Sequence, residues 1–171
     1  MKKLLIVAAV LLAACTVAHA DNTTRIGSEY SVNYGGFIGY ATGDVAWYGM
    51  AFIDINAAKS NLRTRLNLGL AERFFYGVKG FSPNAAIDLQ YLLPITDGFY
   101  FYPSVGLYGE HFSKKTTHNP NNNFGVEAGL GLEFQFAPEF GIFCEGNYQR
   151  MFTKTTVPNR LGGRLGIVFV F

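Results

Sequence analysis

The sequence predicts an all-β protein, an eight-stranded antiparallel up-and-down transmembrane β-barrel. Three observations support this prediction: a secretory leader at the N-terminus, eight segments of alternating polarity, and a final run from Arg164 to Phe171 with bulky apolar residues at every second position. Successive side chains of a strand point to opposite faces, so alternation is expected where one face meets lipid and the other meets a polar interior.

The N-terminus has the parts of a cleaved signal peptide. Lys2 and Lys3 supply positive charge, residues 4–14 are continuously apolar, and Ala18-His19-Ala20 is a small-x-small cleavage site. We therefore expect a cleaved signal peptide at residues 1–20 and a barrel domain at residues 21–171. Such a leader directs export, so we expect the protein in the cell outer membrane.

Charge and cysteine content narrow the class of function. The chain holds 14 Lys and Arg against 12 Asp and Glu, but two of the lysines lie in the leader, so the remainder is formally neutral. This neutrality removes the electrostatic argument for nucleic acid as a partner. Cys144 is the one cysteine after residue 20 and has no disulfide partner there. Residues 12–15 also resemble a lipobox, which would instead lipidate Cys15.

Eight strands are expected, and the alternation is weaker in the first two than in the third. The expected strands cover residues 25–40, 45–56, 62–74, 84–95, 99–112, 124–136, 140–152 and 160–171. The first two are the weakest, because Gly35-Gly36 and the mixed run from Val45 to Phe52 interrupt the alternation. We interpret Gly35-Gly36 and Gly162-Gly163 as bulges or points of close approach. In the third strand, leucines alternate with Arg63, Arg65 and Asn67.

The later segments show the period of two more clearly. In the fourth, Ile87 and Leu89 flank Asp88, and in the fifth, Val105 and Leu107 alternate with polar residues. The sixth is the clearest, with one face made of Phe124, Val126, Ala128, Leu130, Leu132, Phe134 and Phe136. The seventh continues the pattern, and the eighth is the apolar run that ends the chain.

Nearly all the charge of the expected strands falls on one face. That face carries Glu29, Asp54, Asp88, Glu110, Glu127, Glu133 and Glu145 together with Arg63, Arg65, Arg73, Arg160 and Arg164. A small barrel with lipid outside requires such a mixture of signs within, because isolated buried charges are costly. A soluble β-sandwich is the alternative fold, but it would bury its apolar faces and show its charges to water.

The connections alternate in length. Those at residues 57–61, 96–98 and 137–139 are short and rich in turn residues, which predicts that they face the periplasm. The opposite connections are expected outside the cell, at Tyr76 to Pro83, Ser113 to Asn123 and Thr153 to Asn159.

The leader, the eight alternating segments and the terminal apolar residues resemble the small outer-membrane barrel class that includes OmpA-like, OmpX-like and opacity-type porin-family proteins. The resemblance covers the whole chain after the leader and implies an environment of outer-membrane lipid and lipopolysaccharide. It also implies an assembly signal, read by the barrel-assembly machinery and made of Leu165, Ile167, Phe169 and Phe171.

An eight-stranded barrel constrains function by its size. Its interior is just wide enough for side chains to fill, so a large pore is not expected. The leading hypothesis is a non-enzymatic scaffold whose surface loops contact an extracellular ligand or mediate adhesion. The loop from Ser113 to Asn123 is the first candidate for such contacts.

Two other functions stay open from the sequence. His111-Phe112-Ser113 with the downstream Glu127 resembles the His-x-Ser and Glu arrangement of outer-membrane lipid A deacylases. A narrow ion channel would follow if unpaired acidic groups lined a wet interior. No cofactor or metal site is expected, because His118 has no Cys or His neighbour at ligand spacing.

Overall fold

The computed structural model describes residues 30–43, 45–57, 60–75, 78–112, 121–153 and 157–170. The strands are β1 (Tyr30–Ala41), β2 (Val45–Ala57), β3 (Leu62–Phe75), β4 (Val78–Tyr91), β5 (Leu93–Thr96), β6 (Phe99–His111), β7 (Asn122–Ala137), β8 (Phe140–Met151) and β9 (Asn159–Val170). Within these ranges, no helix is long and apolar enough to cross a membrane. The leader, Glu29, Ser113 and Phe171 lie outside the described residues.

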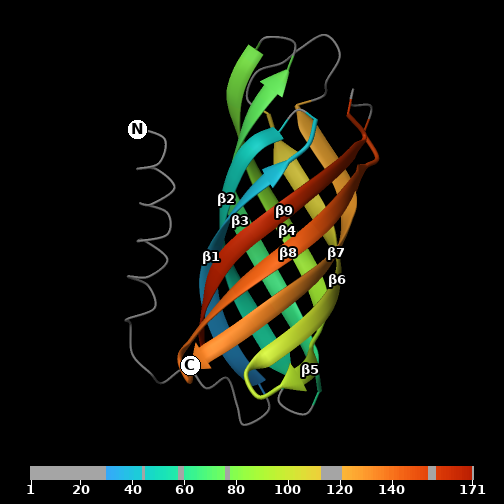
Figure 1. The fold of residues 1–171 in the computed structure, drawn as a ribbon. Helices are drawn as coiled ribbons and strands as arrows, with labels where there is room; N and C mark the ends of the chain where they lie inside the picture. Colours follow the sequence, from blue (N-terminus) through green and yellow to red (C-terminus); the bar gives the residue numbers. More distant parts are fainter. Residues whose placement is uncertain are drawn as a thin grey trace.

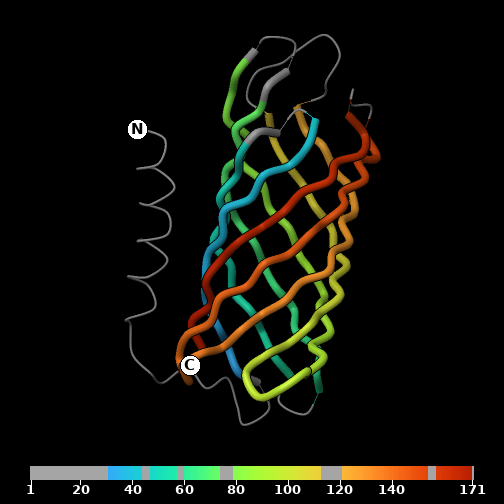
Figure 2. Tube along the Cα trace, viewed as in Figure 1, coloured from blue at the N-terminus to red at the C-terminus, as the bar shows by residue number. Residues whose placement is uncertain are grey.

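The strands form one closed antiparallel sheet. Their order is β4-β3-β2-β1-β9-β8-β7-β6-β5, and β4 also pairs with β6, which completes the ring (Figure 1). The short β5 follows β4 after Leu92 and pairs with the start of the same β6, so eight strands surround the barrel. The closed ladder confirms the predicted barrel and contradicts the sandwich alternative. The start of β1 and the end of β9 lie at one end of the barrel (Figure 2).

The boundaries of the fourth predicted strand are wrong. We expected one strand at residues 84–95 and an outward connection from Tyr76 to Pro83. The structure instead begins β4 at Val78, opposite Phe75 of β3, and separates β5 from β4 at Leu92. Gly80, Ser82 and Pro83 are typical loop residues, yet this segment keeps its register with β3, which explains the error.

The short connections are those predicted. β5 ends at Thr96 and β6 begins at Phe99, so Asp97-Gly98 forms the turn, and Gly98 has a φ of 75° that favours glycine. Likewise β7 ends at Ala137 and β8 begins at Phe140. These connections, with the β2–β3 connection, define what we call the turn end of the barrel. The opposite end is the loop end.

The two faces of the sheet sort by polarity as predicted. The interior holds every described member of the predicted charged face, and each is nearly fully buried: Asp54, Asp88, Glu110, Glu127, Glu133, Glu145, Arg63, Arg65, Arg73, Arg160 and Arg164. Leu68, Leu107 and Leu130 point outward and are 60–69% exposed. This inside-out distribution suits a surface that meets hydrocarbon and a lumen that must satisfy its own polar groups.

Large side chains in the lumen lie over glycines of the neighbouring strand. A Cβ at Gly131 would come within 2.1 Å of the Tyr102 ring opposite, and one at Gly35 within 2.2 Å of the Phe52 ring. The same arrangement recurs where Tyr48 faces Gly39, Met50 faces Gly69 and Phe143 faces Gly166. Gly35 is thus a point of close approach, and the register runs through Gly35-Gly36 without a bulge.

Replacing an inward glycine should therefore disturb the barrel, whereas an outward glycine should tolerate the same change. We expect Gly131→Leu to destabilise the folded state by about 1–3 kcal/mol, because its side chain would overlap the Tyr102 ring. Gly146→Leu is the matched control, since a Cβ there meets nothing within 4 Å. Urea unfolding in detergent micelles measures both, and equal midpoints would contradict the packing described.

Candidate functional site

The charged lumen is the candidate site, and its side chains form three clusters along the barrel. The lower cluster, near the turn end, contains Asp54, Arg63, Arg65, Gln90 and Glu133. The central cluster contains Tyr48, Asn67, Asp88, Glu127, Glu145, Gln149 and Arg164. The upper cluster, near the loop end, contains Arg73, Tyr108, Glu110, Asn123 and Arg160.

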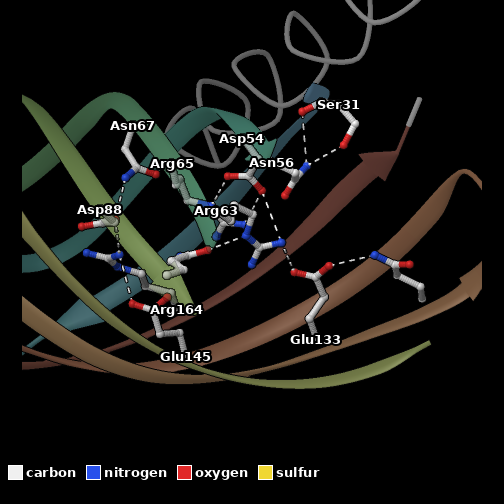
Figure 3. Close-up of polar contacts among 12 residues, drawn as sticks. Ser31, Asp54, Asn56, Arg63, Arg65, Asn67, Asp88, Glu133, Glu145 and Arg164 are labelled. Atoms are coloured by element: carbon white, nitrogen blue, oxygen red, sulfur yellow. Dashed lines mark hydrogen bonds and ion pairs between the residues drawn. The ribbon is translucent and has the colours of Figure 1, made fainter. Parts of the chain in front are cut away.

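The lower cluster is balanced in charge. Arg65 binds Asp54 in a bidentate pair, Nε to Oδ1 at 2.7 Å and Nη2 to Oδ2 at 2.8 Å. Arg63 donates from Nη1 to Glu133 at 2.6 Å and from Nε to Gln90 at 2.6 Å (Figure 3). Two carboxylates therefore neutralise two guanidinium groups, which offsets the cost of removing them from water.

Aromatic rings surround the same arginines. The Arg65 guanidinium carbon lies 3.9 Å from the centre of the Phe52 ring and 4.6 Å from that of Phe143. The Arg63 guanidinium carbon lies 5.2 Å from the centre of the Tyr102 ring, and Tyr102 is fully buried. Guanidinium groups packed on aromatic rings combine dense packing with favourable electrostatics. Side chains therefore fill the lumen at this level.

The central cluster is acidic. Arg164 binds Glu127 at 2.6 Å, Glu145 at 3.1 Å and Asp88 at 3.6 Å, so three carboxylates share one guanidinium. Figure 3 shows Arg164 with Asp88 and Glu145. Neutral donors add to this arrangement: Asn67 donates to Asp88 at 2.8 Å, and Gln149 donates to Glu127 at 2.8 Å. Within the part of the chain that the structure describes, one oxygen of each carboxylate has no hydrogen-bond partner.

The upper cluster is centred on Glu110. Its carboxylate binds Arg73 and both terminal nitrogens of Arg160, the latter at 3.1 Å, and accepts a hydrogen bond from Tyr108 at 3.0 Å. Asn123 donates to the same carboxylate at 2.9 Å. We expected Asn123 in an external loop, but β7 begins at Asn122 and turns the Asn123 side chain into the lumen. The connection between β6 and β7 therefore ends earlier than the predicted loop, which reached Asn123.

The structure does not bring the deacylase-like residues together. His111 is exposed at the end of β6 and its Nδ1 lies 2.6 Å from the side-chain oxygen of Asn122. Glu127 faces the lumen, lies opposite Gly106 rather than His111, and binds Arg164. Ser113 lies outside the described residues. Among the residues that are described, no group of three or more His, Cys, Asp or Glu is placed to hold a metal ion.

The predicted assembly-signal residues lie on one face of the closing strand. Leu165 is 59% exposed and, with Ile167 and Phe169, alternates with inward Arg164 and Val168 along β9. β9 pairs with β8 on one side and with β1 on the other, so these side chains lie on the lipid-facing side of the barrel closure. Phe171 falls beyond the described residues.

Sequence reasoning missed the aromatic part of the lumen. Phe37, Phe52 and Phe143 point inward and pack against one another with ring centres 5.7–6.2 Å apart. We expected a polar interior and therefore did not assign these phenylalanines to it. Their alternation with neighbouring glycines in the sequence was a signal that could have identified them. In β1, Gly35, Phe37 and Gly39 share the inward face, and the opposing strand supplies the large residues.

Removing the central cation should destabilise the barrel strongly. Arg164→Met would leave three buried carboxylates without a guanidinium, and we expect a loss of about 3–5 kcal/mol. Adding Glu127→Gln should recover part of it. Lys79→Met is the control, because Lys79 points outward in a half-exposed pair with Glu72. An Arg164→Met protein that unfolds at the wild-type urea concentration would contradict the pairing.

No protein-family model matches this sequence, and no curated protein matches it. Solved structures do share its fold. The N-terminal β-barrel domain of Pseudomonas aeruginosa OprF has a TM-score of 0.58 and 20% identity, covering 82% of this chain and 97% of that domain. Neisserial surface protein A has a TM-score of 0.63 and 12% identity, covering 83% and 97%.

Ail, the attachment invasion locus protein of Yersinia pestis, is also similar, with a TM-score of 0.51 and 15% identity over 84% of this chain and 98% of Ail. At these identities the likeness concerns the fold alone. Together with the closed ladder and the inside-out polarity, it shows that the chain has the eight-stranded antiparallel β-barrel fold of outer-membrane proteins.

Proposed function

We propose that this protein is a non-enzymatic integral protein of the outer membrane, a rigid scaffold that holds its loop-end connections outside the cell for contact or adhesion. The observation that carries the proposal is the filled lumen. Arg63, Arg65 and Arg164 cross it at two levels, bound to carboxylates and packed on rings. A barrel fixed in this way is stable, but its interior offers little room for solutes.

The orientation follows from the connections. Those at the turn end are short, and the β6–β7 connection at the loop end is longer, between Phe112 and Asn121. Barrels of this kind keep short turns in the periplasm and longer loops outside. The proposal therefore places the start of β1 and the end of β9 in the periplasm, with lipopolysaccharide around the loop end. It also gives Leu165, Ile167, Phe169 and Phe171 the role of assembly signal.

A contact role is supported by similar structures. Ail is named for attachment and invasion, and one of its structures contains a heparin analogue, sucrose octasulfate. In the present chain, the β6–β7 connection carries adjacent Lys114 and Lys115. A polyanionic glycan is therefore the first ligand class to test.

The loop hypothesis predicts a loss of glycan binding without a loss of folding. Replacing residues 113–120 with a short turn should abolish retention on immobilised heparin, because it removes Lys114 and Lys115 from the outer surface. The control is Lys59→Gln, which removes a lysine at the turn end. Undiminished retention by the loop replacement, with a folded barrel on an unboiled gel, would exclude this loop as the contact site.

The filled lumen predicts that general solute passage is absent. In planar bilayers we expect no large, steady conductance steps, since buried side chains occupy the lumen. Large steps would contradict the scaffold proposal.

The acidic central cluster supports a second candidate function, a narrow cation channel. Small cation-selective steps that disappear in Glu127→Gln would favour that channel.

An enzymatic function is not part of the proposal. The deacylase alternative requires His111 and Glu127 to act on one substrate, but they lie on opposite faces of the sheet, and Arg164 holds Glu127 in the lumen. A lipid substrate would reach the outward face alone. This geometry favours a non-enzymatic role.

A further inference from the structure

An apolar hollow interrupts the outward face of the barrel at β8 and β9. Gly146 and Gly163 lie directly opposite each other and both point outward. A Cβ at Gly146 would meet no atom within 4 Å, and one at Gly163 would meet a single backbone oxygen at 3.9 Å. The hollow has a volume of about 730 Å³ and an almost entirely apolar lining. It differs from the inward glycines described above, whose space is occupied by large side chains of the neighbouring strand.

Outward side chains border the hollow toward the turn end and across the neighbouring strands. Tyr148 and Leu161 form the next outward pair toward the loop end, and Cys144 and Leu165 form the next toward the turn end. Across the strands, it is bounded by Leu130 of β7 and Tyr40 of β1, the outward neighbours of Gly146 and Gly163. Tyr40 in turn packs edge-on against Trp47, with ring centres 5.4 Å apart. The hollow is thus continuous with the lipid-facing surface.

An outward cation lies above the hollow. Arg150 and Asn159 form the next outward pair beyond Tyr148 and Leu161, so Arg150 is about 13 Å along the strand from Gly146. Arg150 donates to the side-chain oxygen of Asn159 at 2.6 Å, and Tyr148 donates to the same oxygen at 2.7 Å. In the described part of the chain, Arg150 has no carboxylate partner, whereas outward Lys79 is paired with Glu72.

We propose that this surface binds one lipid A moiety of lipopolysaccharide, with a lipid A phosphate on Arg150 and an acyl chain in the hollow between Gly146 and Gly163. A guanidinium matches phosphate oxygens in charge and geometry. An acyl chain in the hollow makes van der Waals contacts with the apolar lining that the neighbouring side chains of the barrel do not make. The proposal rests on the outer-membrane orientation argued above, which places Arg150 at the outer leaflet.

Charge favours a lipid over a second copy of this chain. A partner copy would have to supply a carboxylate to Arg150 from its own outward face. Among the outward side chains of the described strands, Glu72 is the carboxylate available, and it is already paired with Lys79. An anionic lipid has no such requirement and is present around the whole barrel.

The test compares two altered sites with matched controls. Protein purified from membranes in detergent is incubated with lipid A, and the bound lipid is counted by native mass spectrometry. We expect one retained lipid A, with apparent affinity about tenfold lower in Arg150→Gln and in Gly146→Leu. Lys79→Gln removes another outward cation, and Ala85→Leu adds the same bulk to exposed Ala85 on β4, so both should bind as the wild type does.

Each outcome bears on the proposal. Equal retention of lipid A by the wild type and all variants would overturn the proposal. It would also be overturned if the wild type retained phosphatidylglycerol as strongly as lipid A, because the site would then not select lipid A. Heat-dependent gel mobility, measured first, shows separately whether the barrel proposal itself fails.

Discussion

The antiparallel ladder between β1 and β9 is the constraint on which the rest of the structure depends. This ladder and the β4–β6 pairing close the sheet, so each of the eight strands of the barrel wall is paired with a neighbour on both sides. Closure also divides the side chains into two sets with no exchange between them. One set must be compatible with hydrocarbon, and the other must neutralise itself within a narrow lumen.

The lumen meets this requirement by two kinds of packing. Carboxylates pair with guanidinium groups at three levels, and side chains seated over glycines fill much of the remaining space. The two kinds of packing meet at Arg65, which binds Asp54 and packs against Phe52 and Phe143. Because the charges are held inside, the outside stays apolar, and an exception such as Arg150 stands out. The proposed scaffold role and the proposed lipid contact both depend on this division of the side chains.

Much of this architecture was predictable because a period of two is a strong signal when it is sustained. The strand Asn122–Ala137 was predicted as residues 124–136 from its alternation, and the same signal identified the charged inward residues. The start of β4 was not, since Ser82 and Pro83 have loop composition but are held by pairing with β3. The inward rings were missed because an aromatic residue suits lipid and lumen equally. Whether such a side chain points into the lumen depends on a glycine opposite it in the neighbouring strand. The strand register determines which residue is opposite.

The hollow and its cation could not be predicted for a related reason. Gly146 and Gly163 are 17 residues apart and become neighbours only through the β8–β9 register. A closed barrel with its charges inside should stay folded in detergent until it is boiled. The decisive measurement is the electrophoretic mobility of the protein from isolated outer membranes, with and without boiling in detergent. We expect a clear mobility shift on boiling, whereas a soluble periplasmic protein with no shift would rule out the barrel.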